Sequence, residues 1–394
     1  MKIAIIGAGA SGLMCACMLP TNLSVTVFDK NPSSGKKLLL TGKTKCNLTN
    51  LCSPKQFLES VPQNPKFLTP SLHKFTPSNT IKFFESIGVK TLVKDNNRVF
   101  PNTGGANSIK QAMQNFAISR GITFKFNTKV TTVEQQDTET NFTVNTLDIS
   151  NEITQHCFDI VIIATGGMSF PGTGSTGDGY EFAKSFGHDI ATPRPSLCGL
   201  QFRNSSGISG QTIFCGVQIL DRTYAPVTKK QFGNMLFTKH GVSGPVIFNA
   251  VSTFKSHSIK NHFLQIDFLP NTEKHPQFDP KDKPFYAFKE YLPTSVANWL
   301  AKQAIHPAEI KNVRIPISDF DSIETATITR GGIAINNINS ETMESKLVPN
   351  LFFIGEVLDV DAFSGGFNLQ IAFCTAVACA KNFIKFIKEA NLYG

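Results

Sequence analysis

A glycine-rich turn close to the first residue constrains the fold more than any other feature of this sequence. Gly7, Gly9 and Gly12 form a G-x-G-x-x-G pattern between an apolar segment at residues 2–6 and a second apolar segment that we expect to be a helix. Glycine at these positions permits a tight turn and lets a pyrophosphate approach the backbone. The N-terminus of the helix would supply unpaired N–H groups and the positive end of a dipole.

The next strand-like segment ends in an acid at the position that such a site requires. Residues 23–28 are followed by Asp29, whose carboxylate can accept hydrogen bonds from both hydroxyls of an adenosine ribose. Strand, turn, helix and strand in this order form a βαβ unit, which implies a parallel sheet. The sequence therefore predicts an α/β fold with a Rossmann-like dinucleotide site, although this motif does not distinguish FAD from NAD.

Residues 3–20 also fit a different interpretation, because they carry no charge and follow Met1 and Lys2, as in a signal peptide or membrane anchor. Three glycines would weaken an apolar helix, whereas each has a use in a strand–turn–helix unit. No other stretch is long and apolar enough to cross a bilayer. We therefore expect a cytoplasmic protein that does not associate with a membrane.

Composition narrows the class of protein further. The chain has 394 residues, 41% of them hydrophobic, which is enough for one large core or two ordinary ones. The nine cysteines are scattered, without a Cys-x-x-Cys pair or zinc-ligand spacing, so we expect neither a disulfide framework nor a metal site. The net charge of +9 comes mainly from lysine, which indicates either a solvated surface or a partner such as RNA attracted through its phosphates.

The distribution of apolar segments indicates that both ends of the chain build one domain. Residues 158–164 form a continuous apolar strand, typical of a sheet covered on both faces. Short β-like segments replace this pattern near residue 193, and a buried strand at residues 351–354 restores it before a long apolar helix. We predict an FAD-type domain from residues 1–192 and 329–394, an inserted β-rich domain at 193–328, and a small helical part at about 278–312.

Glycine loops after the later strands favour FAD over NAD. Ala164-Thr165-Gly166-Gly167 is typical of the segment that passes beneath the dinucleotide in two-domain flavoproteins. The carboxylate of Asp359, in the loop that begins at Gly355, can bind ribityl hydroxyls. Ser364-Gly365-Gly366-Phe367-Asn368-Leu369 opens a helix whose dipole would stabilise negative charge on the pyrimidine edge of a reduced flavin.

Several motifs resemble those of the bacterial BaiN-like, YhiN-type flavoproteins, a family that includes aminoacetone-oxidase-like FAD-dependent oxidoreductases. The motifs are Thr41-Gly-Lys-Thr-Lys-Cys-Asn-Leu-Thr-Asn50, Leu236-Phe-Thr238 with Gly241-Val-Ser-Gly-Pro245, Thr342-Met-Glu-Ser-Lys346, Gly355-Glu-Val-Leu-Asp359 and Gly365-Gly-Phe-Asn-Leu-Gln370. The resemblance covers nearly the whole chain. It implies a glutathione-reductase-like FAD domain and an inserted β-barrel-like domain that carries a small helical subdomain.

The resemblance also implies which residues contact FAD. At the matching positions, and with the glycine motif included, these are Gly7, Gly9, Ala10, Ser11, Gly12, Asp29, Lys30, Lys37, Thr41, Asn47, Thr165, Gly166, Gly355, Glu356, Asp359, Gly366, Phe367, Asn368 and Leu369. The chain departs from the family pattern at Lys45, where arginine is usual, at Lys239, where histidine is usual, and at Ile371, where tryptophan is common.

Flavin chemistry transfers a hydride through the ring nitrogen N5, while the protein orients the reactants and supplies a proton. Members of the resembled family act on amines, on steroid-like enones, or on a uridine of ribosomal RNA, which they reduce to dihydrouridine. The positive charge favours the RNA reaction, with NAD(P)H as a transient reductant. A small-molecule oxidase or reductase, and a flavin- or RNA-binding factor without catalysis, remain alternatives.

Disulfide reduction is disfavoured, because Cys46 and Cys52 lack the required spacing and no second dinucleotide motif follows.

No residue stands out as the proton donor. Cys46 lies in a loop expected near the flavin, although a buried inert thiol is the simpler interpretation. His240 follows the unusual Lys239 and is the second candidate. A uridine within folded RNA must be extruded before it reacts, and Phe170 or Phe367 could stack on it, although both also suit packing roles.

Overall fold

The computed structural model describes residues 1–136, 141–203, 205, 207–272, 281, 283–390, with side chains in the last helix described to Phe383. Contacts within the chain divide it into two compact units. Unit 1 contains Met1–Pro193 and Thr329–Gly394, and unit 2 contains Arg194–Ile328. β11 (Ile190–Ser196) and β19 (Ile328–Ile333) form a two-stranded sheet, and the boundaries between the units fall within these strands.

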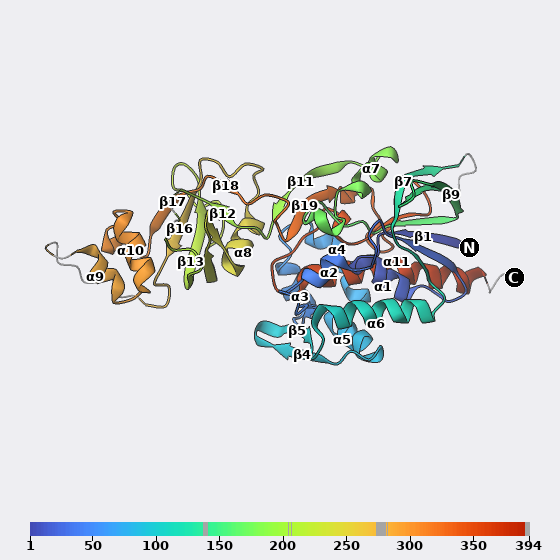
Figure 1. Cartoon of the computed structure of the whole chain (residues 1–394), viewed down its shortest axis with the longest axis horizontal. Helices are drawn as coiled ribbons and strands as arrows, with labels where there is room; N and C mark the ends of the chain where they lie inside the picture. The colour runs from blue at the N-terminus through green and yellow to red at the C-terminus, as the bar shows by residue number, and fades with distance from the viewer. Residues whose placement is uncertain (137–140, 204, 206, 273–280, 282, 391–394) are drawn as a thin grey trace. The chain divides into compact units, whose positions relative to one another are not determined.

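A five-stranded parallel sheet forms the centre of unit 1 (Figure 1). Its strand order is β20-β10-β1-β2-β6, and all four neighbouring pairs are parallel. The strands are β1 (Lys2–Ile6), β2 (Ser24–Phe28), β6 (Thr123–Lys125), β10 (Ile160–Ile163) and β20 (Leu351–Phe353). Because β1 and β20 come from opposite ends of the chain and flank β10, the predicted α/β fold with a Rossmann-like sheet built from both ends is confirmed.

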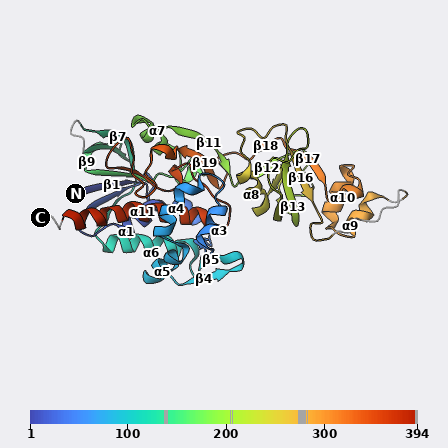
Figure 2. The same cartoon turned by 180° about the vertical axis from the view of Figure 1, so that it is seen from behind.

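Helices pack against one face of this sheet. α1 contacts β1, β2, α6 and α11, and α4 contacts α11; Figure 2 shows these helices side by side. The helices of unit 1 are α1 (Ala10–Met18), α2 (Lys36–Leu40), α3 (Pro54–Glu59), α4 (Pro65–Lys74), α5 (Pro77–Ser86), α6 (Gly105–Ser119), α7 (Asp178–Ser185) and α11 (Phe367–Ala390). Ser53 and Thr76 start α3 and α5 with capping boxes, in which the cap side chain and the third helical residue bond each other's backbone N–H groups.

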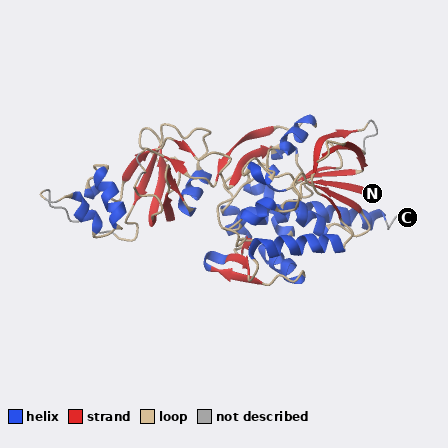
Figure 3. Ribbon diagram, viewed as in Figure 1, coloured by secondary structure: helices blue, strands red, loops and turns tan. Residues whose placement is uncertain are grey.

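Two small antiparallel sheets complete unit 1. β7 (Thr128–Gln135), β8 (Phe142–Asp148) and β9 (Ile153–Phe158) form a three-stranded sheet that contacts β1 and β2 on the side away from α1 (Figure 3). Phe28 packs edge-on against Phe158 at this contact, with ring centroids 5.8 Å apart. β3 (Thr49–Asn50), β4 (Thr91–Lys94) and β5 (Arg98–Pro101) form the second sheet, which holds the segment after Cys46 in place.

Unit 2 is built on a seven-stranded sheet in the order β17-β16-β13-β14-β15-β12-β18, with antiparallel neighbours. Its strands are β12 (Leu200–Gln201), β13 (Thr212–Leu220), β14 (Gln231–Phe237), β15 (Gly241–Ser243), β16 (Phe263–Asp267), β17 (Val313–Pro316) and β18 (Asp319–Phe320). Among the described residues no ladder joins β17 to β18, so the barrel-like closure expected of the insertion is not confirmed.

Helices cover one face of this second sheet. α8 (Pro245–Thr253) packs on β13, β14 and β15, while α9 (Pro284–Lys289) and α10 (Thr294–Lys302) pack on each other. The small helical part expected at about residues 278–312 thus contains two helices, separated by a turn that ends at Pro293. Residues 278–280 and 282 of the expected helical part lie outside the described residues.

Candidate active site

Three glycine loops meet where the parallel strands β1, β10 and β20 end. The carboxyl ends of parallel strands lie at the same edge of a sheet, so the loops that begin at Gly7, Ala164 and Gly355 are neighbours. Their contacts are close: a Cβ added to Gly7 would lie 2.5 Å from the carbonyl oxygen of Ala164, and one added to Gly355 would lie 2.5 Å from Ser11 Oγ. Segments from both ends of the chain therefore form one backbone surface.

The first loop leads into α1 through Gly9, its N-cap residue. The first backbone bond of the helix runs from the Leu13 N–H to the Gly9 carbonyl, so the N–H groups of Ala10, Ser11 and Gly12 precede the helical bonding pattern. A Cβ on Gly12 would lie 1.9 Å from the carbonyl oxygen of Gly7, whereas one on Gly9 would meet nothing within 4 Å. Gly12 thus allows the helix to pack on the strand, and Gly9 leaves open space above the helix N-terminus.

Asp29 ends β2 beside this turn with its carboxylate fixed. Oδ2 accepts a hydrogen bond from the backbone N–H of Ala8 at 2.8 Å, and Oδ1 accepts from the N–H and the side-chain amide of Asn31 at 2.8 and 2.9 Å. Lys30 turns to the start of α7, where its Nζ pairs with Asp178 Oδ2 at 2.6 Å. The half-buried Asp29 carboxylate is therefore oriented at the position predicted for the ribose.

Lys37 and Glu356, both predicted cofactor contacts, form an ion pair across the site. Lys37 Nζ donates to Glu356 Oε1 and Oε2 at 2.9 and 2.8 Å and to Ser169 Oγ at 2.6 Å. Glu356 Oε1 also accepts from the N–H of Thr329, while Thr329 Oγ1 accepts from the N–H groups of Met168 and Ser169. This network ties the loops after β10 and β20 to α2 and to β19.

Asp359 lies further along the same loop in a buried position. The side chain of Asn64 donates to its carbonyl oxygen at 2.6 Å and to Oδ2 at 3.2 Å, and Gln63 donates to Oδ2 at 3.4 Å. Burial raises the pKa of Asp359 above its ordinary value, and the nearby charge of Asp361 adds to this, while the bonds from Gln63 and Asn64 oppose it.

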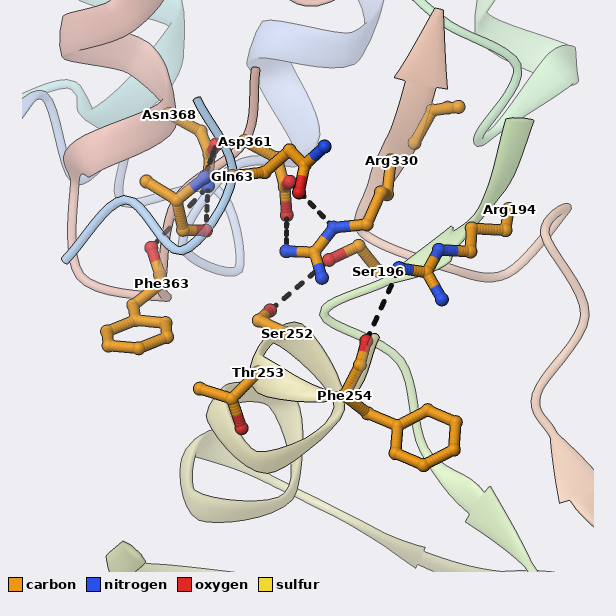
Figure 4. A network of polar contacts seen from close by, with 12 residues as sticks. Gln63, Arg194, Ser196, Ser252, Thr253, Phe254, Arg330, Asp361, Phe363 and Asn368 are labelled. Carbon is orange, nitrogen blue, oxygen red and sulfur yellow. Dashed lines mark hydrogen bonds and ion pairs between the residues drawn. The ribbon is translucent and has the colours of Figure 1, made fainter. Parts of the chain in front are cut away.

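Arg330 and Asp361 form a buried pair that the sequence did not indicate. Arg330 Nε and Nη2 donate to Asp361 Oδ1 and Oδ2 at 2.8 and 2.7 Å, with side-chain exposures of only 6% and 1% (Figure 4). Two parallel bonds fix both planar groups. The sequence offered two signals: Arg330 lies in a mostly apolar strand, and Asp361 lies in the apolar stretch after Asp359. Neither residue by itself indicates its partner.

The Asn368 side chain shapes the start of α11. It accepts from the N–H of Ala362 at 2.9 Å and donates to the Ala362 carbonyl at 2.8 Å, which holds the preceding loop against the helix (Figure 4). Phe367 is buried and packs edge-on against Phe57, with centroids 5.1 Å apart, so it has a packing role. Leu369 packs against the core, and Gln370 accepts from Thr49 and Thr80.

Asn47 reaches the same helix terminus from the other side. Its Oδ1 is buried and, among the described residues, has no hydrogen-bond partner. A Cβ added to Gly366 would lie 2.8 Å from this atom, so the Asn47 amide lies beside the glycine turn before α11. An acceptor held in this way suits a ligand that donates an N–H or O–H group.

The remaining predicted contacts lie in the same unit. Thr41 ends α2 and donates to the carbonyl of Leu38 at 2.6 Å. Thr165 Oγ1 is buried and lacks a hydrogen-bond partner in the described part of the chain, and Gly166 has a positive φ of 75°. Phe170 also has a positive φ, 54°, at the start of a short 3-10 turn.

The two candidates for proton transfer occupy different units. Cys46 lies in unit 1, is 0% exposed, and its pKa is raised by burial to about 11. His240 lies in unit 2, in the exposed turn between β14 and β15. Tyr180 of α7, which the sequence did not single out, is buried, and its hydroxyl has no partner among the described residues. Burial raises the pKa of Tyr180, and the charges of Glu356 and Asp359 add to the shift.

These observations fit a bound dinucleotide. The open space above Gly9, the oriented carboxylate of Asp29 and the unsatisfied oxygen of Asn47 are each suited to one part of FAD. No group of three or more His, Cys, Asp or Glu side chains suited to a metal ion occurs in the described ranges. None of the helices within those ranges is long and apolar enough to cross a membrane.

Curated relatives match along almost the whole chain. A ribosomal RNA dihydrouridine synthase of Haemophilus influenzae is 32% identical over 402 residues, which cover 95% of this chain and 96% of the relative. A protein of the same name from Escherichia coli is 29% identical, covering 96% and 97%. A 3-dehydro-bile acid delta(4,6)-reductase of Clostridium scindens is 24% identical, covering 95% and 97%.

A solved structure and a family model agree on the fold. The 3-ketosteroid-delta4-(5alpha)-dehydrogenase of Rhodococcus jostii superposes with a TM-score of 0.53 at 12% identity, covering 96% of this chain and 97% of that one. The family model described as the HI0933-like protein Rossmann domain matches residues 1–382. With its parallel sheet and glycine loops, the chain belongs to the HI0933-like Rossmann-domain family of FAD-dependent oxidoreductases.

Proposed function

We propose that this enzyme reduces a uridine of ribosomal RNA to dihydrouridine. The observation that carries the proposal is the match, over nearly the full length of both chains, to two relatives named ribosomal RNA dihydrouridine synthase. The net charge of +9 supports a polyanionic substrate, because lysine-rich surfaces attract phosphates.

We assign the cofactor contacts from the geometry of the loops. The N–H groups at the start of α1 would bind the pyrophosphate, and Asp29 the ribose hydroxyls. Asp359, whose raised pKa marks a buried carboxyl group, would bind ribityl hydroxyls, and the N-terminus of α11 would face the pyrimidine edge of the ring. The ion pair between Lys37 and Glu356 would hold α2 and the loops after β10 and β20 in place around the cofactor.

Bound FAD supplies a hydride donor at N5, which NAD(P)H would regenerate. In uracil, the carbon–carbon double bond is conjugated to a carbonyl, so hydride adds to one carbon and an acid protonates its neighbour. The protein must therefore position the extruded base, exclude water and deliver one proton. The raised pKa values of Cys46 and Tyr180 mean that both groups carry their protons at neutral pH, as a proton donor must.

The test is nucleoside mass spectrometry of ribosomal RNA. RNA transcribed without modifications is incubated with the FAD-loaded protein and NADPH, digested, and searched for a uridine that has gained two hydrogens. We expect dihydrouridine with the wild-type protein and less of it with Gly9→Ala at limiting FAD, because the added methyl group occupies the open space above α1. Absence of dihydrouridine with flavin-loaded protein and either NADH or NADPH would contradict the proposal.

A second candidate is reduction of a small-molecule enone. The relative named as a bile acid delta(4,6)-reductase favours it, and the chemistry of the reducible double bond is related. Flavin bleached by NADPH and reoxidised by a steroid enone, but not by ribosomal RNA, would select this function instead.

A further inference from the structure

Among the helices that the structure describes in unit 2, α8 packs on one face of the seven-stranded sheet, and the opposite face carries aromatic side chains. Residues directly opposite each other in neighbouring strands share a face. The register pairs Phe214 with Asn234, Gly216 with Phe232, and Gln218 with Gln265. We call this side the outer sheet face; its members on the central strands are Thr212, Phe214, Gly216, Gln218, Leu220, Phe232, Asn234, Leu236, Phe263, Gln265, Asp267, Arg314 and Pro316.

The opposite face of the same sheet has the core of unit 2. Ile213, Cys215 and Val217 of β13 and Met235 and Phe237 of β14 are all buried, and α8 packs on these strands. Alternation along the two strands therefore places large apolar side chains where they are covered. Phe214 and Phe232 break the rule that such side chains face the core.

Both rings are open to solvent. Phe214 is 47% exposed and Phe232 is 58% exposed. A Cβ added to Gly216 would lie 2.9 Å from Cε1 of Phe232, so the Phe232 ring lies over the backbone of Gly216. Phe214 is two residues from Gly216 on the same face of β13, which makes the two rings diagonal neighbours. Because Gly216 has no side chain, the Phe232 ring and the end of the Lys230 side chain both lie close over its backbone.

Cations border this surface. Lys230 Nζ lies 5.5 Å from the centre of the Phe232 ring and pairs with the buried Asp267 at 2.8 Å, which fixes its position. Arg314, on the outer sheet face of β17, lies over the exposed ring of Tyr224 at 4.6 Å. The hairpin from residue 212 to 237 carries Arg222, Lys229 and Lys230 but only one acid, Asp221.

Three of the other side chains on the face are polar amides. Asn234, Gln218 and Gln265 can both donate and accept hydrogen bonds, as base edges require. The centre of a stable interface between protein copies is depleted of charged residues, whereas this face carries Lys230 beside Phe232 and Arg314 on β17. Aromatic rings on a sheet, flanked by cations, are instead the arrangement on which unstacked bases of RNA are bound.

We propose that the outer sheet face binds a single-stranded segment of the substrate RNA, with bases stacked on Phe214 and Phe232 and phosphates near Lys230 and Arg314. The proposal rests on the proposed function, since it names the surface that holds the RNA while a uridine is reduced. Stacking accepts any base, so this surface supplies affinity, and selection of the uridine belongs to the flavin site.

The experiment measures binding of a fluorescent single-stranded oligouridine to the FAD-loaded protein by anisotropy. We expect Phe214→Ala and Phe232→Ala each to weaken binding about tenfold, and the double variant more, because stacking on one ring is typically of that size. Phe232→Trp keeps an aromatic ring and should bind as the wild type does. Tyr286→Ala, which removes a ring 62% exposed on α9 of the same unit, is the matched control and should also leave binding unchanged.

Steady-state turnover on ribosomal RNA gives the second measurement. Since neither phenylalanine belongs to the flavin site, the double variant should keep its flavin spectrum and kcat but show a raised KM for RNA.

If the wild type forms dihydrouridine and the double variant binds oligouridine equally well, the outer sheet face is not the RNA surface, although the proposed function stands. If the wild type forms no dihydrouridine and binds no RNA, both proposals fail. A double variant that changes the oligomeric state in light scattering, without a change in RNA binding, would assign the face to contact between copies.

Discussion

The buried pair of Arg330 and Asp361 shows how much a single contact contributes to the site. Both charges are removed from water, and the two bonds of the pair offset much of the desolvation. Arg330→Met removes the positive partner of a buried carboxylate, so we expect it to lower the free energy of unfolding by about 3–5 kcal/mol.

Urea unfolding followed by circular dichroism measures this effect. The control is Arg330→Met combined with Asp361→Leu, which removes both charges and should recover most of the loss. A double variant as unstable as the single one would mean that the cost comes from lost packing rather than from loss of the positive partner.

The Cys46 thiol is expected to be structural. It is inaccessible to solvent, and its φ of 55° lies in the left-handed region, where a tight loop fixes its position. A substrate could not reach it without movement of the loop. We predict that Cys46→Ala keeps FAD and more than about half of the wild-type turnover. A thiol that the substrate cannot reach takes no part in the reaction, so its removal should have little effect. A loss of turnover with FAD and fold retained would instead assign the proton donor to Cys46.

At the scale of the element, we expect two glycines of the strand–turn–helix unit to have different roles: Gly12 is needed for folding, and Gly9 is needed for cofactor binding. Gly12→Ala places a methyl group 1.9 Å from the Gly7 carbonyl, so α1 cannot pack as it does. We expect a loss of about 3 kcal/mol in the free energy of unfolding, at the upper end of overpacking costs. Gly9→Ala meets no atom within 4 Å and has an ordinary φ of −78°, so the apo protein should unfold as the wild type does.

The same pair of variants differs in FAD affinity. The new methyl group of Gly9→Ala occupies the space proposed for the pyrophosphate, and we expect the FAD dissociation constant to rise at least about tenfold, or about 1.4 kcal/mol. Fluorescence titration of the apo protein with FAD measures it. Wild-type affinity in Gly9→Ala would show that the pyrophosphate does not lie over this turn.

Individual strands, turns and helices could be predicted from the sequence where the local pattern of residues was distinctive. The glycine turn, the apolar strand before Ala164 and the glycine turn before α11 each combine a periodic pattern with a residue type that has one conformational use. The insertion was harder, because short strands give weak patterns and closure of a sheet depends on pairing between distant strands. Alternation along β13 is visible in the sequence, but the nearness of Phe214 and Phe232 depends on the register with β14.

Contacts between distant loops could not be predicted for the same reason. Lys37 pairs with Glu356, 319 positions away in the sequence, and Arg330 pairs with Asp361. Composition shows that such charges exist, and only the fold shows which of them meet. The family resemblance predicted that Lys37 and Glu356 contact the cofactor, but it did not show that they contact each other.

At the scale of the whole molecule, acid should destabilise the fold through His188. This histidine is buried, its Nε2 is 2.8 Å from Ser345 Oγ, and its ring packs edge-on against Phe353 of β20. Burial lowers the pKa of His188 below its ordinary value of 6.5, and the charge of Asp189 only partly opposes this. The unfolded chain therefore binds a proton at a higher pH than the folded one.

The sign of the pH dependence follows from this difference. Above pH 6.5 the group is neutral in both states, and the stability it contributes is lost as the pH falls from 6.5 through the lower folded pKa. We predict that the melting temperature falls over this interval and that the fall is smaller in His188→Gln, measured by scanning calorimetry of the apo protein. Equal pH dependence in both proteins would contradict this assignment.

Every functional proposal above depends on FAD lying across loops from both ends of the chain. The most direct measurement is a crystal structure of the flavin-loaded protein. We expect the pyrophosphate over Gly9 to Gly12, the adenosine ribose on Asp29, and the flavin ring beside the glycine turn before α11. FAD bound away from Asp29, or held by residues of only one end of the chain, would contradict it.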